Sequence, residues 1–405
     1  MLLFYNLGIR LYFLLVLIAS AFNKKARLWI EGRKNAQFRA FPQSAWFHFA
    51  SLGEFEQGQP VLAAYRASHP EIRVVITFFS PSGFEIRKNT PLADSVYYLP
   101  LDTAANARKF IDAINPSIAV FTKYEYWYHF FDELHKRGIP LYIISGIFRP
   151  KQVFFKWYGG LHRQMLGFVT RFFVQDEDSK TLLQSIGISN VSVSGDTRFD
   201  RVWTNTQSPK SFPVIDEFKA GRKVVIAGST WPEDEAMLVQ LAKHNAGWKF
   251  IIAPHEISEE KINKLISLLP EESTVRYSQI SNLKSQIANL NILIIDNIGM
   301  LSSLYQYGDI TYIGGGFGVG IHNTLEAAAF GLPVIFGPNY QKFKEARDLV
   351  TLKLGFSIND ENELKAVFAD LLKDDKYKGI SPMIRQYVRE HTGATELIVS
   401  YISKK

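Results

Sequence analysis

Residues 45–79, AWFHFASLGEFEQGQPVLAAYRASHPEIRVVITFF, contain the pattern that decides the fold. Apolar runs at Ala45–Ala50 and Arg73–Phe79 flank a helix-period segment at Gln59–Ser68. Short apolar runs with β-branched residues are typical of parallel strands that are buried on both faces beneath helices. This stretch therefore predicts a strand–helix–strand unit of an α/β domain.

The same alternation continues on both sides of one polar, Pro-bearing stretch, Thr204–Pro213. Further buried strands are expected at Ile118–Thr122, Leu141–Ser145, Arg171–Val174, Val191–Ser194, Lys223–Ala227, Lys249–Ala253, Ile292–Ile295, Ile310–Ile313 and Val334–Phe336. We expect two doubly wound, Rossmann-like α/β domains at residues 36–203 and 214–380, joined by a linker at 204–213. Residues 381–405 are expected to be helical, and the sequence leaves open whether they pack on the first domain.

The composition is that of an ordinary globular protein. The chain has 405 residues, 47% of them apolar and 21% charged, which excludes disordered, collagen-like and coiled-coil classes. The 46 Lys and Arg against 39 Asp and Glu give a net charge of +7. Because Cys is absent, disulfide scaffolds, cysteine zinc sites and thiol catalysis are excluded. His residues are scattered and form no HExxH motif, so we expect no metal and no cofactor held by the protein.

The N-terminus, Met1–Phe22, is almost entirely apolar, but its unbroken run, Leu11–Ala19, is too short to span a bilayer. Basic side chains follow at once, at Lys24, Lys25, Arg27, Arg33 and Lys34. One alternative is a signal peptide cleaved near Ala19-Ser20-Ala21, and another is a buried first helix. We favour a membrane anchor with a basic collar over residues 1–35, which touches anionic lipid from the cytoplasmic side.

Three strand-end segments of the first domain carry charged side chains: His48–Glu54, Lys123–Glu125 and Gly195–Asp200. Loops at the carboxyl ends of parallel strands face the ligand crevice, where Glu54 can accept a proton from a hydroxyl. Arg198 can hold a carboxylate or a phosphate in a fork. The alternatives are a helix-start acid at Glu54, solvated charges beside an aromatic helix face at Glu125, and an internal ion pair between Arg198 and Asp200.

In the second domain, a strand leads into the glycine run of residues 314–326, GGGFGVGIHNTLE. Such a run lets backbone N–H groups approach a phosphate at the start of a helix, although neither the dinucleotide fingerprint nor a P-loop is matched. Glu326 is placed for a ribose diol, and its alternative role is that of a first-turn acid. Three more strand ends fit a nucleotide site or are plain connections: Gly228–Glu235, Ala253–Glu256 and Asp296–Met300.

In their order, these segments resemble the 3-deoxy-D-manno-octulosonic acid (Kdo) transferases of lipopolysaccharide assembly, from the N-terminal anchor to about residue 350. The family motifs HxxSVGE, TPTG, YLPxD, STHxGEE and DTMGEL are similar to His48–Glu54, Ser80–Gly83, Tyr98–Asp102, Ser229–Glu235 and Asp296–Leu301. The motif GGHNPLExAAxxxPVxxGP is similar to Gly320–Pro338.

The resemblance implies a two-domain GT-B glycosyltransferase with a cleft between its domains. It would transfer Kdo from CMP-Kdo to the lipid A precursor, lipid IVA, at the cytoplasmic face of the inner membrane. The implied partners are CMP-Kdo, the lipid acceptor and anionic membrane lipid, with no nucleic acid. Glu54 stands at the position of the family's catalytic base. The positions that match the family's CMP contacts are Pro254, His255, Ile298, Gly299, Met300, Asn323, Thr324, Leu325 and Glu326.

Several departures mark a divergent branch of the family. In the family's METELWPN, similar to residues 122–129, the first Glu is Lys123 in this chain and the second is retained as Glu125. The Lys of GxLKFD is Arg198, and the Arg of PRHPER is missing because His255 directly follows Pro254. The expected catalytic set is therefore Glu54, Arg198, Lys123 and Glu125. The alternatives are a GT-B enzyme that uses a UDP-sugar on a lipid acceptor and an inactive membrane-bound nucleotide-binding module.

Overall fold

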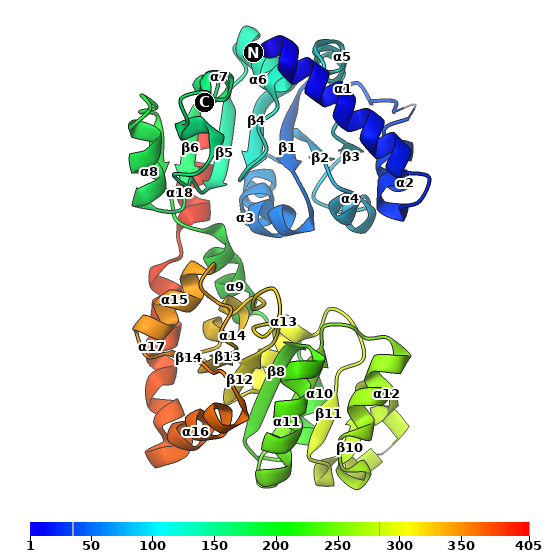
Figure 1. Cartoon of the computed structure of the whole chain (residues 1–405), viewed down its shortest axis with the longest axis vertical. Coiled ribbons are helices and arrows are strands. Elements are labelled where there is room, and N and C mark those ends of the chain that lie inside the picture. The colour runs from blue at the N-terminus through cyan, green and yellow to red at the C-terminus, as the bar shows by residue number, and fades with distance from the viewer. Residues whose placement is uncertain (35, 283, 405) are drawn as a thin grey trace. The chain divides into compact units, whose positions relative to one another are not determined.

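The computed structural model describes residues 1–34, 36–282 and 284–404, which form two compact units (Figure 1). Unit 1 comprises Met1–Arg201 and His391–Lys405, and unit 2 comprises Val202–Glu390. The helix α9 (Thr197–Gln207) continues into the stretch expected to be a linker, so the start of that stretch is helical.

The sheet of unit 1 has seven parallel strands in the order β3-β2-β1-β4-β5-β6-β7. Their bounds are β1 (Ser44–Phe49), β2 (Arg73–Phe78), β3 (Ser95–Tyr98), β4 (Pro116–Thr122), β5 (Leu141–Gly146), β6 (Arg171–Val174) and β7 (Val191–Val193). The strand order reverses between β1 and β4, which are hydrogen-bonded neighbours. Ligands of doubly wound folds bind outside the carboxyl ends of the strands at such a switch point.

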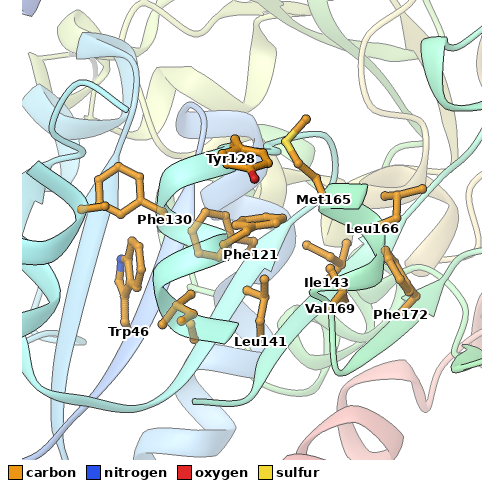
Figure 2. Close-up of a cluster of buried hydrophobic side chains, with 14 of the residues drawn as sticks. Trp46, Phe121, Tyr128, Phe130, Leu141, Ile143, Met165, Leu166, Val169 and Phe172 are labelled. Atoms are coloured by element: carbon orange, nitrogen blue, oxygen red, sulfur yellow. The ribbon is translucent and has the colours of Figure 1, made fainter. Parts of the chain in front are cut away.

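Helices cover both faces of this sheet: α3 (Leu52–Ser68), α4 (Pro81–Arg87), α5 (Ala104–Ile114), α6 (Tyr128–Lys136), α7 (Gly160–Gly167), α8 (Glu177–Gln184) and α18 (Ala394–Ile402). Every residue of β1 is buried, and its side chains alternate between two cores. Trp46 packs with Phe121 and Phe130 on one face (Figure 2). Phe47 and Phe49 belong to the other core, which the C-terminal helix α18 helps to close.

Unit 2 repeats this architecture with a seven-stranded parallel sheet in the order β10-β11-β9-β8-β12-β13-β14. The strands are β8 (Val224–Thr230), β9 (Lys249–Pro254), β10 (Thr274–Arg276), β11 (Ile292–Ile294), β12 (Ile310–Ile313), β13 (Val334–Phe336) and β14 (Gly355–Ser357). The helices are α10 (Pro213–Lys219), α11 (Pro232–His244), α12 (Glu259–Ser267), α13 (Leu301–Leu304), α14 (Leu325–Ala329), α15 (Lys344–Thr351), α16 (Glu361–Leu372) and α17 (Lys376–Glu390). The switch point lies between β8 and β12.

The two sheets confirm the expected α/β fold of two doubly wound domains. The sequence analysis missed β3, β10 and β14, which lie at sheet edges and have three or four residues each. Edge strands of this length bury few side chains, so they leave a weak apolar signal in the sequence.

The N-terminal helix α1 (Leu2–Ala19) runs beside unit 1 from α6 to the short helix α2 (Lys24–Glu31) (Figure 1). Its Tyr5 hydroxyl donates to Asp102, and its Asn6 Oδ1 accepts from His129 Nε2 at 2.6 Å. Asp102 is itself buried and accepts the N–H groups of His129 and Phe130 at the start of α6. The Asp of the YLPxD-like motif therefore anchors both helices.

The opposite side of α1 is apolar and exposed, at Leu3, Phe4, Leu7, Leu11, Leu14, Leu15, Leu17 and Ile18. Within the described residues, α1 is the one helix long and apolar enough to cross a membrane, judged by length and composition alone. Lys24, Lys25, Arg27 and Lys34 are exposed beside it, but Arg33 is partly buried and donates to main-chain carbonyls. Arg33 thus turns inward from the run of basic residues, and contact of the basic collar with anionic lipid stays a prediction.

Tyr5→Phe should lower the free energy of unfolding of the full chain by about 1–3 kcal/mol, because the buried Asp102 loses a hydrogen-bond donor. Tyr12→Phe is the matched control, since Tyr12 lies on the same helix and is 40% exposed. Denaturant unfolding in an uncharged detergent measures both changes. Equal, negligible effects of the two substitutions would contradict this role of Tyr5.

Candidate functional site

Glu54 lies in the first turn of α3, directly after β1 at the switch point of unit 1. The hydroxyl of Ser51, at the start of the helix, donates a hydrogen bond to the Glu54 carboxylate. Glu54 is partly exposed, so its carboxylate can also meet a ligand. This placement is compatible with both a helix-start acid and a catalytic base.

Glu125 lies after β4, the neighbour of β1 across the switch point, and a buried chain of polar groups positions it. Trp46 Nε1 donates to Thr77 Oγ1 at 2.8 Å, and Thr77 Oγ1 is 2.8 Å from His48 Nδ1. His48 Nε2 is 3.3 Å from Glu125, which also accepts from Trp127 Nε1 at 2.9 Å. In a neutral imidazole, a proton on Nε2 leaves Nδ1 to accept from Thr77. The His of the HxxSVGE-like motif thus orients Glu125.

Arg198, in the first turn of α9, pairs with Asp196 and not with Asp200. The shortest N–O distance in this pair is 2.7 Å, and Asp196 also accepts from Gln57 Nε2 at 2.8 Å. Asp200 instead accepts the N–H groups of Gly393 and Thr395, just before and within α18. The alternative that joined Arg198 to Asp200 was therefore wrong.

Tyr124 connects the groups that the sequence analysis assigned separately. Burial raises the pKa of its phenol; Arg149 and Arg198 lower this pKa, and Glu54 and Asp176 raise it. Glu54 and Arg198 therefore act on one common neighbour. Lys123 also lies close, with its Nζ 5.9 Å from the centre of the Tyr124 ring.

Lys123 has a positive φ of 63°, directly after β4. A side chain in the left-handed region costs energy and is found mostly where the surrounding structure fixes a functional loop. The observation agrees with a functional role for the strand end that carries Lys123 and Glu125.

In unit 2, Asp234 holds the strand-end loops of β8 and β12 together at the switch point. Its carboxylate accepts from the N–H groups of Trp231 and Gly315, each at 2.9 Å, and from the Tyr312 hydroxyl at 2.7 Å. The side chain is 1% exposed, and burial raises its pKa. Asp234 therefore fixes the main chain of the glycine run to the loop after β8.

Three stacked rings line the same edge. The His255 ring stacks with those of Trp231 and His322, with ring centroids 4.8 and 4.4 Å away. Trp231 Nε1 donates to His322 Nε2 at 3.1 Å. Burial and the neighbouring His255 lower the pKa of His322, so its imidazole is neutral at pH 7 and Nε2 can accept.

These rings and the glycine loop enclose a cavity of about 500 Å³. Gly315 and residues 317–322 of the glycine run line this cavity. Of the nine residues expected to contact CMP, His255 is the one among its lining residues. Among the other eight, Met300 and Leu325 are buried, Ile298 is 88% exposed, and Gly299 has a φ of 94°. Pro254 ends β9 beside the switch point.

Asn323 and Glu326 are hydrogen-bonded to each other at 3.2 Å, and Asn323 Oδ1 accepts the N–H of Leu325. The helix expected from Asn323 begins at Leu325 and has five residues, so its dipole is small. The buried Thr324 hydroxyl has no hydrogen-bond partner among the described residues. The structure therefore brings His255 to the glycine-loop cavity and places Asn323–Glu326 just after the loop.

Close packing of the backbone also requires glycine at two positions of the glycine run. A Cβ on Gly314 would lie 2.3 Å from Ser229 O, and one on Gly316 would lie 2.6 Å from the Gly337 backbone. These two positions thus serve backbone packing, whereas a Cβ on Gly318 would make ordinary contacts.

Sequence reasoning gave no role to Tyr124, Asp196, Asp234, Trp231 or His322. All five belong to strand-end segments of the switch-point strands or of β7, which was the available signal. In the part of the chain that the structure describes, no group of three His, Asp or Glu residues can hold a metal ion. That the protein needs no metal or cofactor stays a prediction.

Asp234→Ala should destabilise unit 2 by about 2–4 kcal/mol, because it leaves three buried donors without an acceptor. Glu233→Ala is the control, since Glu233 is the exposed neighbour in the same helix. Chemical denaturation measures both. If the two variants unfold at the same denaturant concentration, Asp234 does not stabilise the glycine run.

Comparison with known proteins finds similarity to 3-deoxy-D-manno-octulosonic acid transferases. Residues 23–201 match the family model of 3-deoxy-D-manno-octulosonic-acid transferase. The chain is 27% identical over 356 residues to the 3-deoxy-D-manno-octulosonic acid transferase of Chlamydia muridarum, which covers 85% of this chain and 82% of the relative. It is 26% identical over 386 residues to that of Haemophilus influenzae, covering 89% and 87%.

Solved structures share the fold. UDP-GlcNAc 2-epimerase from Neisseria meningitidis has a TM-score of 0.61 at 17% identity and covers 89% of this chain and 100% of its own. The MurG protein of Acinetobacter baumannii has a TM-score of 0.54 at 13% identity, also covering 89% and 100%. Together with the two switch-point sheets, these matches give a GT-B fold. These matches support the 3-deoxy-D-manno-octulosonic acid transferase family for this chain and indicate a glycosyltransferase.

Proposed function

We propose that the chain transfers Kdo from CMP-Kdo to a hydroxyl of the lipid A precursor, lipid IVA, at the cytoplasmic face of the inner membrane. The observation that carries the proposal is the position of Glu54. Glu54, which the HxxSVGE-like motif matches to the family's base, lies in the first turn of the helix after β1, at the switch point of unit 1.

The chemistry requires a base more than an acid. The acceptor oxygen forms a bond to the anomeric carbon of Kdo, while the bond from that carbon to the phosphate oxygen of CMP breaks. CMP leaves with the bonding electron pair, already anionic, and needs little protonation. The acceptor hydroxyl is the weaker partner, so its proton passes to the Glu54 carboxylate as the new bond forms.

The other charged groups of unit 1 bind and orient. Arg198, held by Asp196, and Lys123 supply positive charge for the Kdo carboxylate. Glu125, held by His48 and Trp127, keeps a fixed orientation and is the second carboxylate at this edge. It is the next candidate for the base if Glu54 is not.

We place the donor in unit 2, with the CMP phosphate near Gly318–Asn323 and the ribose near Glu326. The glycine-loop cavity of about 500 Å³ supports this placement, since residues 317–322 line it together with His255. The stacked Trp231 and His255 rings offer an aromatic surface at the same edge.

Glu54→Gln should lower the turnover number by about 10²–10⁴-fold with CMP affinity nearly unchanged, because the amide cannot accept the proton. Glu56→Gln is the matched control, as Glu56 lies on the same helix and forms ion pairs with Arg87 and Arg201. Single-turnover transfer from CMP-Kdo to lipid IVA measures both variants. Retention of more than about a tenth of the wild-type rate by Glu54→Gln, with chemistry rate-limiting, would exclude Glu54 as the base.

We further propose that α1 holds unit 1 on the membrane by its exposed apolar side, while its other side stays docked through Tyr5 and Asn6. An apolar helix side flanked by exposed Lys24, Lys25 and Arg27 suits an anionic membrane surface. The helix would then lie in the interface instead of crossing the bilayer.

Leu11→Glu combined with Leu15→Glu should weaken membrane binding at least about tenfold, because two leucines proposed to insert into the membrane become charged. Both side chains are exposed, at 53% and 56%, so the fold should tolerate them. Leu352→Glu, at an exposed leucine of unit 2, is the control. Activity should fall on bilayer-embedded acceptor and persist on detergent-dispersed acceptor; equal membrane binding by all three proteins would refute this role of α1.

A further inference from the structure

A second cavity, of about 360 Å³, lies in unit 1 beneath α1 and has no part in the chemistry described above. Phe13 of α1 forms one wall, and the other lining residues include Arg33, Phe38, Leu101, Asn106 and Lys109. The lining thus combines apolar side chains with two cations.

Arg33 is bound by the protein only through neutral acceptors. Its Nε donates to Leu99 O at 2.7 Å, its Nη1 to Trp29 O at 3.1 Å and its Nη2 to Phe79 O at 2.8 Å. The guanidinium carbon lies 3.8 Å from the centre of the Trp29 ring. Burial lowers the pKa of Arg33 to about 9, so the side chain remains charged at neutral pH.

This charge has no direct counter-ion. Within the described residues, no carboxylate forms an ion pair with Arg33, and Glu125 acts on it only through space. A guanidinium has five N–H donors, so two remain after the three main-chain bonds. A partly buried cation without a carboxylate leaves a positive potential that favours an anion.

Lys109 lines the same cavity, and Trp29 contacts Arg33. Lys109 is exposed on α5, lines the cavity and forms no ion pair among the described residues. The buried Trp29 Nε1–H, on the ring against which Arg33 stacks, has no acceptor in the described part of the chain. Among the described residues, the lining of the cavity therefore includes two cations and no carboxylate.

The apolar side of the site identifies the kind of anion. Phe13, Phe38 and Leu101 would exclude water around a ligand, and Phe13 belongs to the helix whose outer side is exposed and apolar. A free inorganic anion would make no favourable contact with the apolar side chains. An anion attached to acyl chains would contact both the apolar side chains and the cations. The ligand class that fits is a phosphorylated lipid.

We propose that the cavity formed by Phe13, Arg33 and Lys109 binds the phosphate group of an acylated lipid. The inference rests on the proposed membrane contact of α1. Two sources share this chemistry: a phospholipid of the surrounding membrane and the phosphates of the lipid acceptor. In either case, the bound phosphate would fix unit 1 at a set depth in the membrane interface.

The decisive variant is Lys109→Glu, because Arg33 also ties three main-chain carbonyls together and its replacement could unfold the unit. Arg108→Glu is the matched control: Arg108 is the exposed neighbour on α5, undergoes the same charge change and does not line the cavity. The full chain in an uncharged detergent is titrated calorimetrically with dihexanoyl phosphatidic acid, dihexanoyl phosphatidylcholine and inorganic phosphate. These measurements need no donor substrate, so they are independent of whether Kdo transfer occurs.

We expect saturable binding of the phosphatidic acid, weakened about tenfold or more by Lys109→Glu and less than about twofold by Arg108→Glu. Phosphatidylcholine should not compete, and inorganic phosphate should bind at least about tenfold more weakly than the phosphatidic acid. No saturable binding, or equal losses in the two variants, would overturn the site. Equal affinity for inorganic phosphate would overturn its assignment to a lipid.

A second experiment distinguishes a membrane phospholipid from the lipid acceptor as the source of the phosphate. Binding to phosphatidylglycerol vesicles and to a bisphosphorylated diglucosamine lipid is compared for the wild-type chain and Lys109→Glu. If Lys109→Glu weakens binding to both ligands, the site binds membrane lipid in general. If it weakens binding to the diglucosamine lipid alone, the site binds the acceptor. Dependence with neither would contradict the proposal.

Discussion

Main-chain hydrogen bonds join β1 to β4 in unit 1 and β8 to β12 in unit 2, and these two pairings determine where the molecule can act. At each pair the strand order reverses, so the following connections lead to opposite faces of the sheet and leave the carboxyl ends uncovered. Glu54 and Glu125 follow the first pair, and Trp231 and the glycine run follow the second. The strands are buried on both faces, which leaves their ends as the place for polar chemistry.

Buried polar groups hold the loops of both edges in place. Thr77 and His48 fix Glu125 in unit 1, and Asp234 fixes Gly315 and Trp231 in unit 2. In both cases a fully buried side chain satisfies main-chain or indole donors. Such supporting groups give a site its geometry without touching the substrate.

The sequence allowed the fold class, the two domains and the central strands to be predicted, because short apolar runs such as Ala45–Ala50 alternate with helix-period segments. The edge strands β3, β10 and β14 could not be found, since a strand of three or four residues with half-exposed side chains has no clear period.

The site was predicted in part. Motif order indicated the family, and the role of Glu54 stays a prediction. Spacing could not show that Arg198 pairs with Asp196, since Asp196 and Asp200 are equally plausible partners along the chain. Nor could it show that Arg33 turns inward from a run of exposed basic residues. Both depend on contacts with residues far away in the sequence, namely Gln57 with Asp196 and Leu99 and Phe79 with Arg33.

The central claim is that a hydroxyl of a lipid acceptor, deprotonated at the edge of unit 1, displaces CMP from Kdo. The most direct test is to incubate the purified full chain with CMP-Kdo and lipid IVA and to follow both products by mass spectrometry. The account predicts that each CMP released is matched by one Kdo residue gained by the lipid. Turnover with a UDP-sugar in place of CMP-Kdo, or release of CMP with no mass gain on the lipid, would contradict it.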